Sequence, residues 1–213
     1  MTLQINKFYA VQYNAADEGC PDNLTGFFNH ASFEWSPYEY YPELLEIKNE
    51  YRLALSDPNI NFDILSFDFY QIGVTYVSRR FLKVCDLLSA RYRAVPLEIS
   101  LGDKIRKEDY FIFLPGESLP ALDKALSVYE AAKDFETGNV IASPLYPGEV
   151  TIEKIDSFAV LPGIESDIFR CQETLQLFCS DRFKSAAKGL KGISFVAIDE
   201  NYRYDPWSDF EEL

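Results

Sequence analysis

One short phrase occurs twice in the chain and constrains the local structure at both places. In each copy, alternating apolar residues lead into a serine, and an arginine and a phenylalanine stand two and three positions after it. The residues are Ser78, Arg80 and Phe81 in the first copy and Ser180, Arg182 and Phe183 in the second. A strand that leads into this phrase predicts the start of a helix, because a serine hydroxyl can accept a hydrogen bond from a backbone N–H of the first turn.

The arginines are the unusual part of the phrase. A cation near the positive end of a helix dipole is unfavourable by about 0.3 to 1 kcal/mol. We therefore expect Arg80 and Arg182 to reach back to a carboxylate or to strand carbonyls. The alternative is an anion site at the helix start, with Arg79 and Arg80 assisting the free N–H groups. No glycine-rich segment precedes either helix, which favours the first interpretation.

The remaining periodicity predicts an α+β fold with a mixed or antiparallel sheet, a few short helices and two similar strand-to-helix units. Strands are expected at 7–13, 61–70, 94–100, 110–114, 151–160, 164–170, 175–179 and 192–198. Helices are expected after Pro42, from the first phrase to about Tyr92, over 121–135, and from the second phrase to Gly189. The 61–70 segment is apolar on both faces, which predicts a central strand.

Length and charge bound the class of protein. A chain of 213 residues can bury a core without disulfides or metals, and we expect a single domain over 1–213. The formal net charge of −14 argues against nucleic acid and anionic membranes as partners, since both require basic patches, and it favours a basic partner. Acids dominate 17–68 and 108–181, whereas bases gather around the two phrases.

The cysteines and the first residues predict a cytoplasmic protein. Cys20, Cys85, Cys171 and Cys179 form no CxxC pair, and Cys85 falls on an apolar helical stripe, so we expect reduced thiols. The opening residues lack the pattern of a signal peptide, and no apolar run approaches the ~20 residues of a membrane helix.

The sequence offers no recognisable reaction centre. His30 is the only histidine, and it is far along the chain from every cysteine, so a packing role is expected for it. Paired acids are frequent, but none stands in a glycosidase or metal-site frame, and no Walker loop, GxGxxG or HExxH occurs. We therefore expect no catalytic site, no metal and no cofactor.

Two segments combine aromatic residues with acids, which is a composition typical of protein interfaces. The candidate partner-binding residues are Trp35, Tyr38, Glu39 and Tyr40 in an aromatic loop, and Asp205, Trp207, Asp209, Phe210, Glu211 and Glu212 in the acidic tail segment 199–213. The alternative is that the loop packs on its own domain and that the tail segment is a frayed end or a packed strand.

The stretches "VSRRFLKVCDLL", "VPLEI" and "DIFRCQETLQLFCSDRFKSAAKGLKGISF" together resemble a family of bacterial immunity proteins from polymorphic toxin systems, first catalogued as a domain of unknown function. The family features after the first phrase are Phe169 and Arg170, the second phrase, and Leu190, Gly192, Ile193 and Phe195. The match covers 72–99 and 164–198, within a family-like part over 72–198. It is weak over 1–71 and absent from 199–213. Arg79 departs from the acidic residue of the family pattern.

This resemblance implies a protein that binds a cognate toxin in the producing cell and neutralises it by stoichiometric occlusion, without enzymatic activity. It assigns a scaffold role to the two phrases, to Phe169 and Arg170, and to Gly192. One alternative is an enzyme that reverses a toxin's modification, using Arg80 or His30. Another is a structural adaptor of a secretion system or phage particle. The sequence leaves the oligomeric state open.

Overall fold

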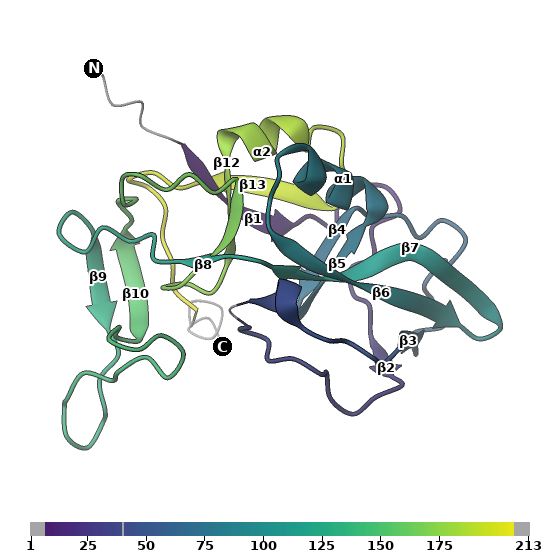
Figure 1. Ribbon diagram of the computed structural model, residues 1–213, viewed down its shortest axis with the longest axis horizontal. Coiled ribbons are helices and arrows are strands. Elements are labelled where there is room, and N and C mark those ends of the chain that lie inside the picture. Colours follow the sequence, from purple (N-terminus) through teal and green to yellow (C-terminus); the bar gives the residue numbers. More distant parts are fainter. Residues whose placement is uncertain (1–6, 40, 207–213) are drawn as a thin grey trace.

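The computed structural model describes residues 7–39 and 41–206, and within them the strands form three sheets (Figure 1). The first sheet has six strands and is antiparallel except where β3 pairs with β6. In spatial order it contains β2 (Gly26–Phe28), β3 (Tyr51–Leu55), β6 (Tyr92–Leu101), β7 (Lys104–Pro115), β5 (Val74–Ser78) and β4 (Phe69–Ile72).

The second sheet has five strands and is antiparallel except where β8 pairs with β11. In spatial order it contains β13 (Ile193–Ala197), β1 (Phe8–Tyr13), β12 (Leu177–Ser180), β11 (Ile168–Cys171) and β8 (Ser118–Leu119). With its mixed sheets and two short helices, α1 (Arg79–Leu87) and α2 (Asp181–Ala186), the described chain confirms the predicted α+β class. Neither helix has the length and apolar character needed to cross a membrane.

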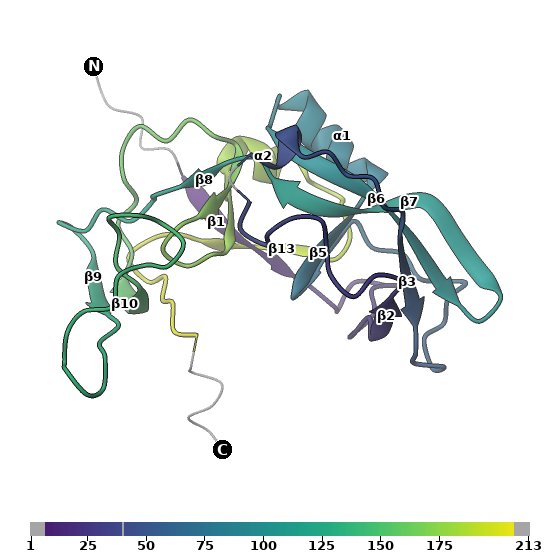
Figure 2. The same cartoon turned by 60° about the horizontal axis from the view of Figure 1, so that its bottom comes forward.

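The third sheet pairs β9 (Val128–Ala131) with β10 (Ile152–Ser157) in an arm, residues 123–159, at one end of the molecule (Figures 1 and 2). The arm is joined to the five-stranded sheet through a core cluster that includes Ile155, Phe158 and Phe178. The arm is therefore fixed to the body of the protein through this cluster.

Both copies of the repeated phrase begin a helix as predicted. The Ser78 hydroxyl accepts hydrogen bonds from the backbone N–H groups of Arg80 and Phe81 at 3.0 and 3.3 Å. The Ser180 hydroxyl accepts one from Phe183 at 3.2 Å. Each serine ends a strand, so the chain turns from strand to helix at the capping residue.

The arginines pair with carboxylates, which confirms the first interpretation. Arg80 contacts Asp68 at 2.8 Å and Arg182 contacts Asp167 at 3.3 Å. Each acid also accepts a hydrogen bond from the serine hydroxyl of its own unit at 2.5 Å, and its backbone carbonyl accepts one from that serine's N–H at 3.0 Å. The repeat is thus an acid, a two-stranded hairpin and a capped helix, built once from β4 and β5 and once from β11 and β12.

The two units meet at their phenylalanines. Phe81 and Phe183 are fully buried, and their ring centroids lie 5.5 Å apart in an edge-to-face arrangement. The helices that carry them lie side by side in Figures 1 and 2. The surrounding core cluster takes residues from both large sheets, including Phe69 and Cys179. The repeated phrase therefore joins the two sheets.

Gly192, which was assigned a scaffold role, lies against the first unit. Its φ of +76° belongs to the left-handed region that favours glycine, and a Cβ there would lie 2.5 Å from the carbonyl oxygen of Phe69. The neighbouring N–H of Lys191 donates to Asp68 at 2.8 Å. The close approach thus lets the chain before β13 bind the Asp68 carboxylate.

The helix predicted over 121–135 is wrong. Residues 123–127 form a turn, in which Asp123 accepts hydrogen bonds from the N–H groups of Ala125 and Ser127, and β9 follows directly. The apolar stripe that predicted the helix is not buried as a stripe, since Leu122 is in the core whereas Leu126 is 73% exposed. Pairing with β10 outweighs helical periodicity here, because most of a helix's stability in proteins comes from packing of its apolar face.

Two further predicted elements are wrong in type or place. The helix after Pro42 is a single 3-10 turn, Pro42–Leu44, and the later apolar positions Tyr51 and Leu55 belong to β3, whose burial alternates. Of the predicted strand 61–70, only Phe69 and Tyr70 belong to a strand, β4, which lies at the sheet edge rather than in its centre. Phe62 and Leu65, which precede β4, are buried although they lie in turns and irregular chain rather than in a strand.

The remaining elements lie where they were predicted, with shifted ends. The first helix stops at Leu87, because Tyr92 already begins β6. The strands expected at 7–13, 94–100, 110–114, 164–170, 175–179 and 192–198 correspond to β1, β6, β7, β11, β12 and β13, and that at 151–160 corresponds to β10.

Removing the shared aromatic contact should destabilise the whole protein. We expect Phe183→Ala to lower the free energy of unfolding by about 3 to 5 kcal/mol, because it leaves a cavity among fully buried rings. Phe27→Ala is the matched control, since that ring is 74% exposed, and its effect should stay within ~0.5 kcal/mol. Denaturant melts of both variants measure this, and equal stability of the two would contradict the scaffold role.

Candidate functional site

The aromatic loop is anchored in the core by one of its predicted contact residues. Trp35 is 8% exposed, stacks on Phe33 with ring centroids 4.7 Å apart, and meets the Tyr51 ring edge-on at 5.1 Å. The Glu34 carboxylate holds the loop by accepting hydrogen bonds from the N–H groups of Lys48 and Asn49. Trp35 therefore packs on its own domain, which was the alternative use of this loop.

Tyr38 lies closer to the surface than Trp35. Its side chain and that of Glu39 are half-buried, and the Arg170 guanidinium lies 5.5 Å from the centroid of the Tyr38 ring. Tyr40 lies outside the described residues. The family-type Arg170 thus holds the loop from the β11 side by a cation–π contact.

The described part of the tail segment packs against the arm. Tyr202 is buried in the core of the five-stranded sheet, and Tyr204 forms a two-hydrogen-bond bridge with Ile155 of β10 at 2.8 and 3.0 Å. Asp205 follows it and is half-buried. The other predicted contact residues of the tail segment, Trp207, Asp209, Phe210, Glu211 and Glu212, lie outside the described residues.

The loop and the tail segment come together near the turn between β11 and β12. Tyr204 and Pro206 border a hollow that Leu175 lines, and Pro37 and Tyr38 border a second hollow lined by the same leucine. Burial lowers the pKa of Arg170, against the opposing effect of Tyr146 and Tyr38. Two segments far apart in the sequence therefore border one surface around Leu175.

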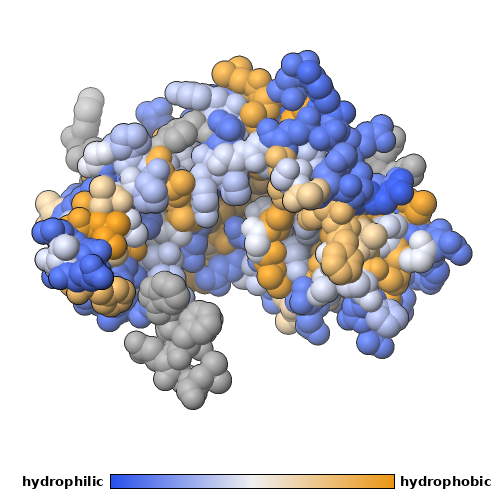
Figure 3. Space-filling view, turned by 90° about the horizontal axis from the view of Figure 1, so that it is seen from below, coloured by the Kyte–Doolittle hydropathy of each residue, from blue (hydrophilic) through white to orange (hydrophobic). Residues whose placement is uncertain are grey.

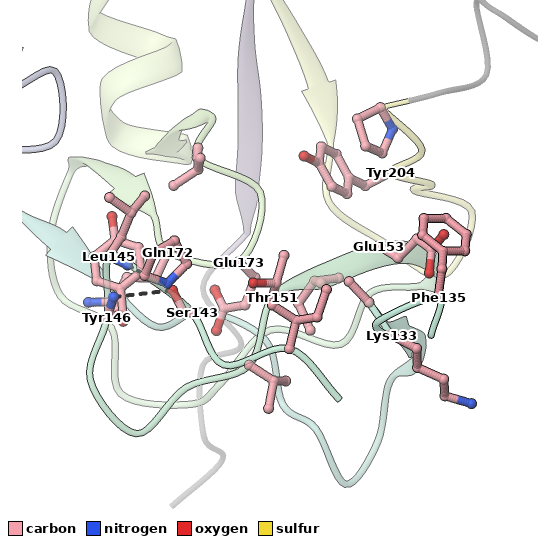
Figure 4. Close-up of a pocket in the computed structure, with 17 residues that line it drawn as sticks. Lys133, Phe135, Ser143, Leu145, Tyr146, Thr151, Glu153, Gln172, Glu173 and Tyr204 are labelled. Carbon is pink, nitrogen blue, oxygen red and sulfur yellow. Dashed lines mark hydrogen bonds between the residues drawn. The ribbon is translucent and has the colours of Figure 1, made fainter. Parts of the chain in front are cut away.

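A pocket of about 720 Å³ opens beside this surface, between the arm and the β11–β12 turn (Figure 4). Most of its lining is apolar, and its polar groups include the carboxylates of Glu153 and Glu173. The lining residues that define its walls are Phe135, Ile141, Leu145, Tyr146, Ile152, Leu175, Tyr204 and Pro206. Leu175 also borders two smaller hollows on either side, one of which reaches Tyr38. The pocket suits an apolar side chain of a partner.

Beside the pocket, one thiol contacts one carboxylate, and the carboxylate is bound by backbone N–H groups. Glu173 accepts hydrogen bonds from the backbone N–H groups of Ala121 and Leu122 and from the Cys171 thiol at 3.2 Å. Burial raises the pKa of Cys171, and the Glu173 charge adds to this, so the thiol stays protonated. His30 lies against the Tyr51 ring, 5.4 Å between centroids, in the aromatic loop. The described residues contain no cluster of acids, cysteines and histidine suited to a metal ion.

The sequence interpretation missed the arm side of this site. The residues from Lys133 to Ile152 were assigned to a helix end, loops and a strand, with no binding role. Their sequence gave only an indirect indication. From Phe135 to Tyr146, short groups of apolar residues are separated by turn residues. This pattern fits exposed hairpins and loops equally well.

Comparison with known proteins gives a family. Residues 48–200, more than half of the chain, match the model of a family described as Immunity protein family (Imm11). The matched range includes both copies of the repeated phrase, Arg170 and the whole arm. A search of curated proteins found no match.

The buried thiols have a measurable consequence. Burial raises the pKa of Cys85, Cys171 and Cys179, so iodoacetamide at pH 7.5 should leave all three unmodified in the native protein. Half-buried Cys20 should react, slowly, and all four should react after denaturation. Peptide mass spectrometry measures the labelling. Fast native labelling of Cys171 would reveal a reactive thiol beside the pocket and favour an enzyme.

Proposed function

The chain belongs to the immunity protein family Imm11, and we propose on this basis that it binds a cognate protein toxin in the cytoplasm of the producing cell and neutralises it by stoichiometric occlusion. The family match over 48–200 is the observation that carries the proposal. The net charge of −14 supports a toxin with a basic surface, since opposite charges speed association and exclude wrong partners.

The packing of the candidate catalytic groups supports occlusion rather than chemistry. The Arg80 guanidinium donates to Asp68 and, at 2.7 Å, to the carbonyl oxygen of Gly189, so its hydrogen bonds join the first repeated unit to the segment that follows α2. His30 packs on Tyr51. An enzyme that reverses a toxin's modification would need such groups directed at a substrate.

The cysteines are compatible with a reducing compartment. All four are free thiols, and three of them are buried as small apolar groups. The structural adaptor remains a rival function, and it predicts assembly of the chain with itself or with a particle in the absence of any toxin.

The ratio of protein to toxin separates occlusion from enzymatic reversal. Titrating the chain against the activity of the toxin encoded beside its gene should give an equivalence point near equimolar, with a dissociation constant on the order of nanomolar or tighter, as for other inhibitor pairs. His30→Ala and Arg80→Ala, measured on the folded fraction, should leave the equivalence point unchanged. Protection at a small fraction of the toxin concentration would favour the enzyme.

Charge in the tail segment should act on the rate of association. Converting Asp205, Asp209, Glu211 and Glu212 to their amides should slow association and flatten its salt dependence, with little change in dissociation, as expected for charges at an interface rim. The matched control neutralises four exposed acids elsewhere, Glu18, Glu46, Glu50 and Asp103, and changes the net charge equally. Stopped-flow association across a salt series compares the two. The same loss of rate in both variants would mean that only net charge matters.

A further inference from the structure

The arm exposes several large apolar side chains to solvent. Figure 3 shows apolar atoms among charged ones at this end of the molecule. Within sixteen residues the exposed side chains are Leu126 (73%), Val128 (58%), Phe135 (105%), Val140 (50%) and Ile141 (41%). Scattered exposed apolar residues are normal on a protein surface, whereas a group of them on one element marks an interaction site.

Phe135 is the most exposed of these residues, and hydrogen bonds hold the loop around it. The Asp134 carboxylate before it accepts hydrogen bonds from the N–H of Thr137 and from its hydroxyl, both at 2.7 Å. The N–H of Gly138 donates to the Asp134 carbonyl at 2.8 Å, and the N–H of Asp134 donates to that of Asn139 at 2.9 Å. The loop around Phe135 is therefore ordered before a partner arrives, which lowers the entropic cost of binding through this ring.

The exposed group continues into the pocket described above. Phe135 and Ile141 belong to both, and the floor is formed by the buried side chains of Tyr146 and Ile152. In Figure 4, Phe135 and Glu153 lie on the same side of the pocket, while Lys133 points away from it. A partner that covers Phe135 thus meets an apolar hollow with a carboxylate at its rim.

The charge of the arm defines what kind of partner fits. Residues 123–156 hold seven acids and three lysines. Two of these lysines are paired inside the arm, Lys124 with Glu149 and Lys154 with Asp156. The exposed acids Glu130, Glu136 and Glu153 therefore give the apolar group an acidic border.

We propose that the exposed apolar side chains of the arm and the pocket beside them form the main contact for the toxin, and that they recognise a toxin segment in which an apolar side chain lies next to a lysine or arginine. The apolar side chain enters the pocket and packs against Phe135, and the cation pairs with Glu153. This inference rests on the proposed function. It names the arm, rather than the aromatic loop, as the anchor, because Trp35 is buried in the core whereas the whole Phe135 ring is in solvent.

A second copy of the chain is a poor occupant of the same surface. Two arms facing each other would bring together two acidic borders, and like charges held close in an interface repel each other. A basic segment meets the same border favourably. The charge thus distinguishes a toxin from self-association.

The test compares two phenylalanines of similar exposure at different ends of the molecule. Phe135→Ala should weaken binding to an inactivated form of the toxin encoded beside this chain's gene by about 30-fold or more, as expected for a central anchor. Phe27→Ala, on β2, should stay within about 3-fold. Glu153→Lys should weaken binding more at low salt than at high salt, and Glu46→Lys, at an exposed acid elsewhere, should not. Titration calorimetry measures affinity, and thermal melts confirm that each variant is folded.

Each result decides between the partners. If the wild-type chain neutralises the toxin at equimolar ratio and Phe135→Ala binds equally well, the arm is not the anchor, although the proposed function stands. If the chain alone sediments as a dimer that Phe135→Ala disrupts, a second copy covers the arm and the inference is wrong. If the wild-type chain neither binds nor neutralises the toxin, the proposed function and the inference both fail.

Discussion

The arrangement of the two large sheets depends on the hydrogen bonds of one buried carboxylate, that of Asp68. It accepts hydrogen bonds from the Ser78 hydroxyl, the Arg80 guanidinium and the N–H of Lys191. The carbonyl of Lys191 in turn accepts from the N–H groups of Asp68 and Phe69. These groups come from the start of β4, the first turn of α1 and the segment before β13, so one carboxylate connects elements of both sheets. Because a buried charge without partners costs several kcal/mol, each of these contacts depends on the others.

The helix starts could be predicted from the sequence because capping is local. A serine, two following N–H groups and a phenylalanine three positions on are all within one turn. The partners of the arginines could not be identified, since Asp68 and Asp167 are two of 34 acids and stand at different distances before their serines, with hairpins of unequal length between. Only strand pairing brings each acid to its helix.

The arm shows the opposite limit of prediction. Its apolar periodicity matched a helix over 121–135, but a helix is stable in a protein when its apolar face is buried, and here the side chains of Leu126 and Phe135 are in solvent. Similarly, the composition of the aromatic loop predicted anchors, whereas burial assigns Trp35 to the core and leaves Tyr38 half-buried. Composition identifies residues suited to binding, and only the fold decides which of them face solvent.

The repeated units and the arm differ in burial, and this difference separates the residues that stabilise the fold from those available for recognition. The side chains of the repeated units are fixed by buried contacts, so a change at Phe81 or Phe183 alters the core that both sheets share. The arm contributes little to that core, because several of its large apolar side chains are exposed and its backbone is held by hydrogen bonds within the arm. Substitutions there can change which segment the arm accepts with little effect on folding. If the chain binds a toxin as proposed, recognition residues on the arm can change without disturbing the Asp68 carboxylate that orders the rest of the chain.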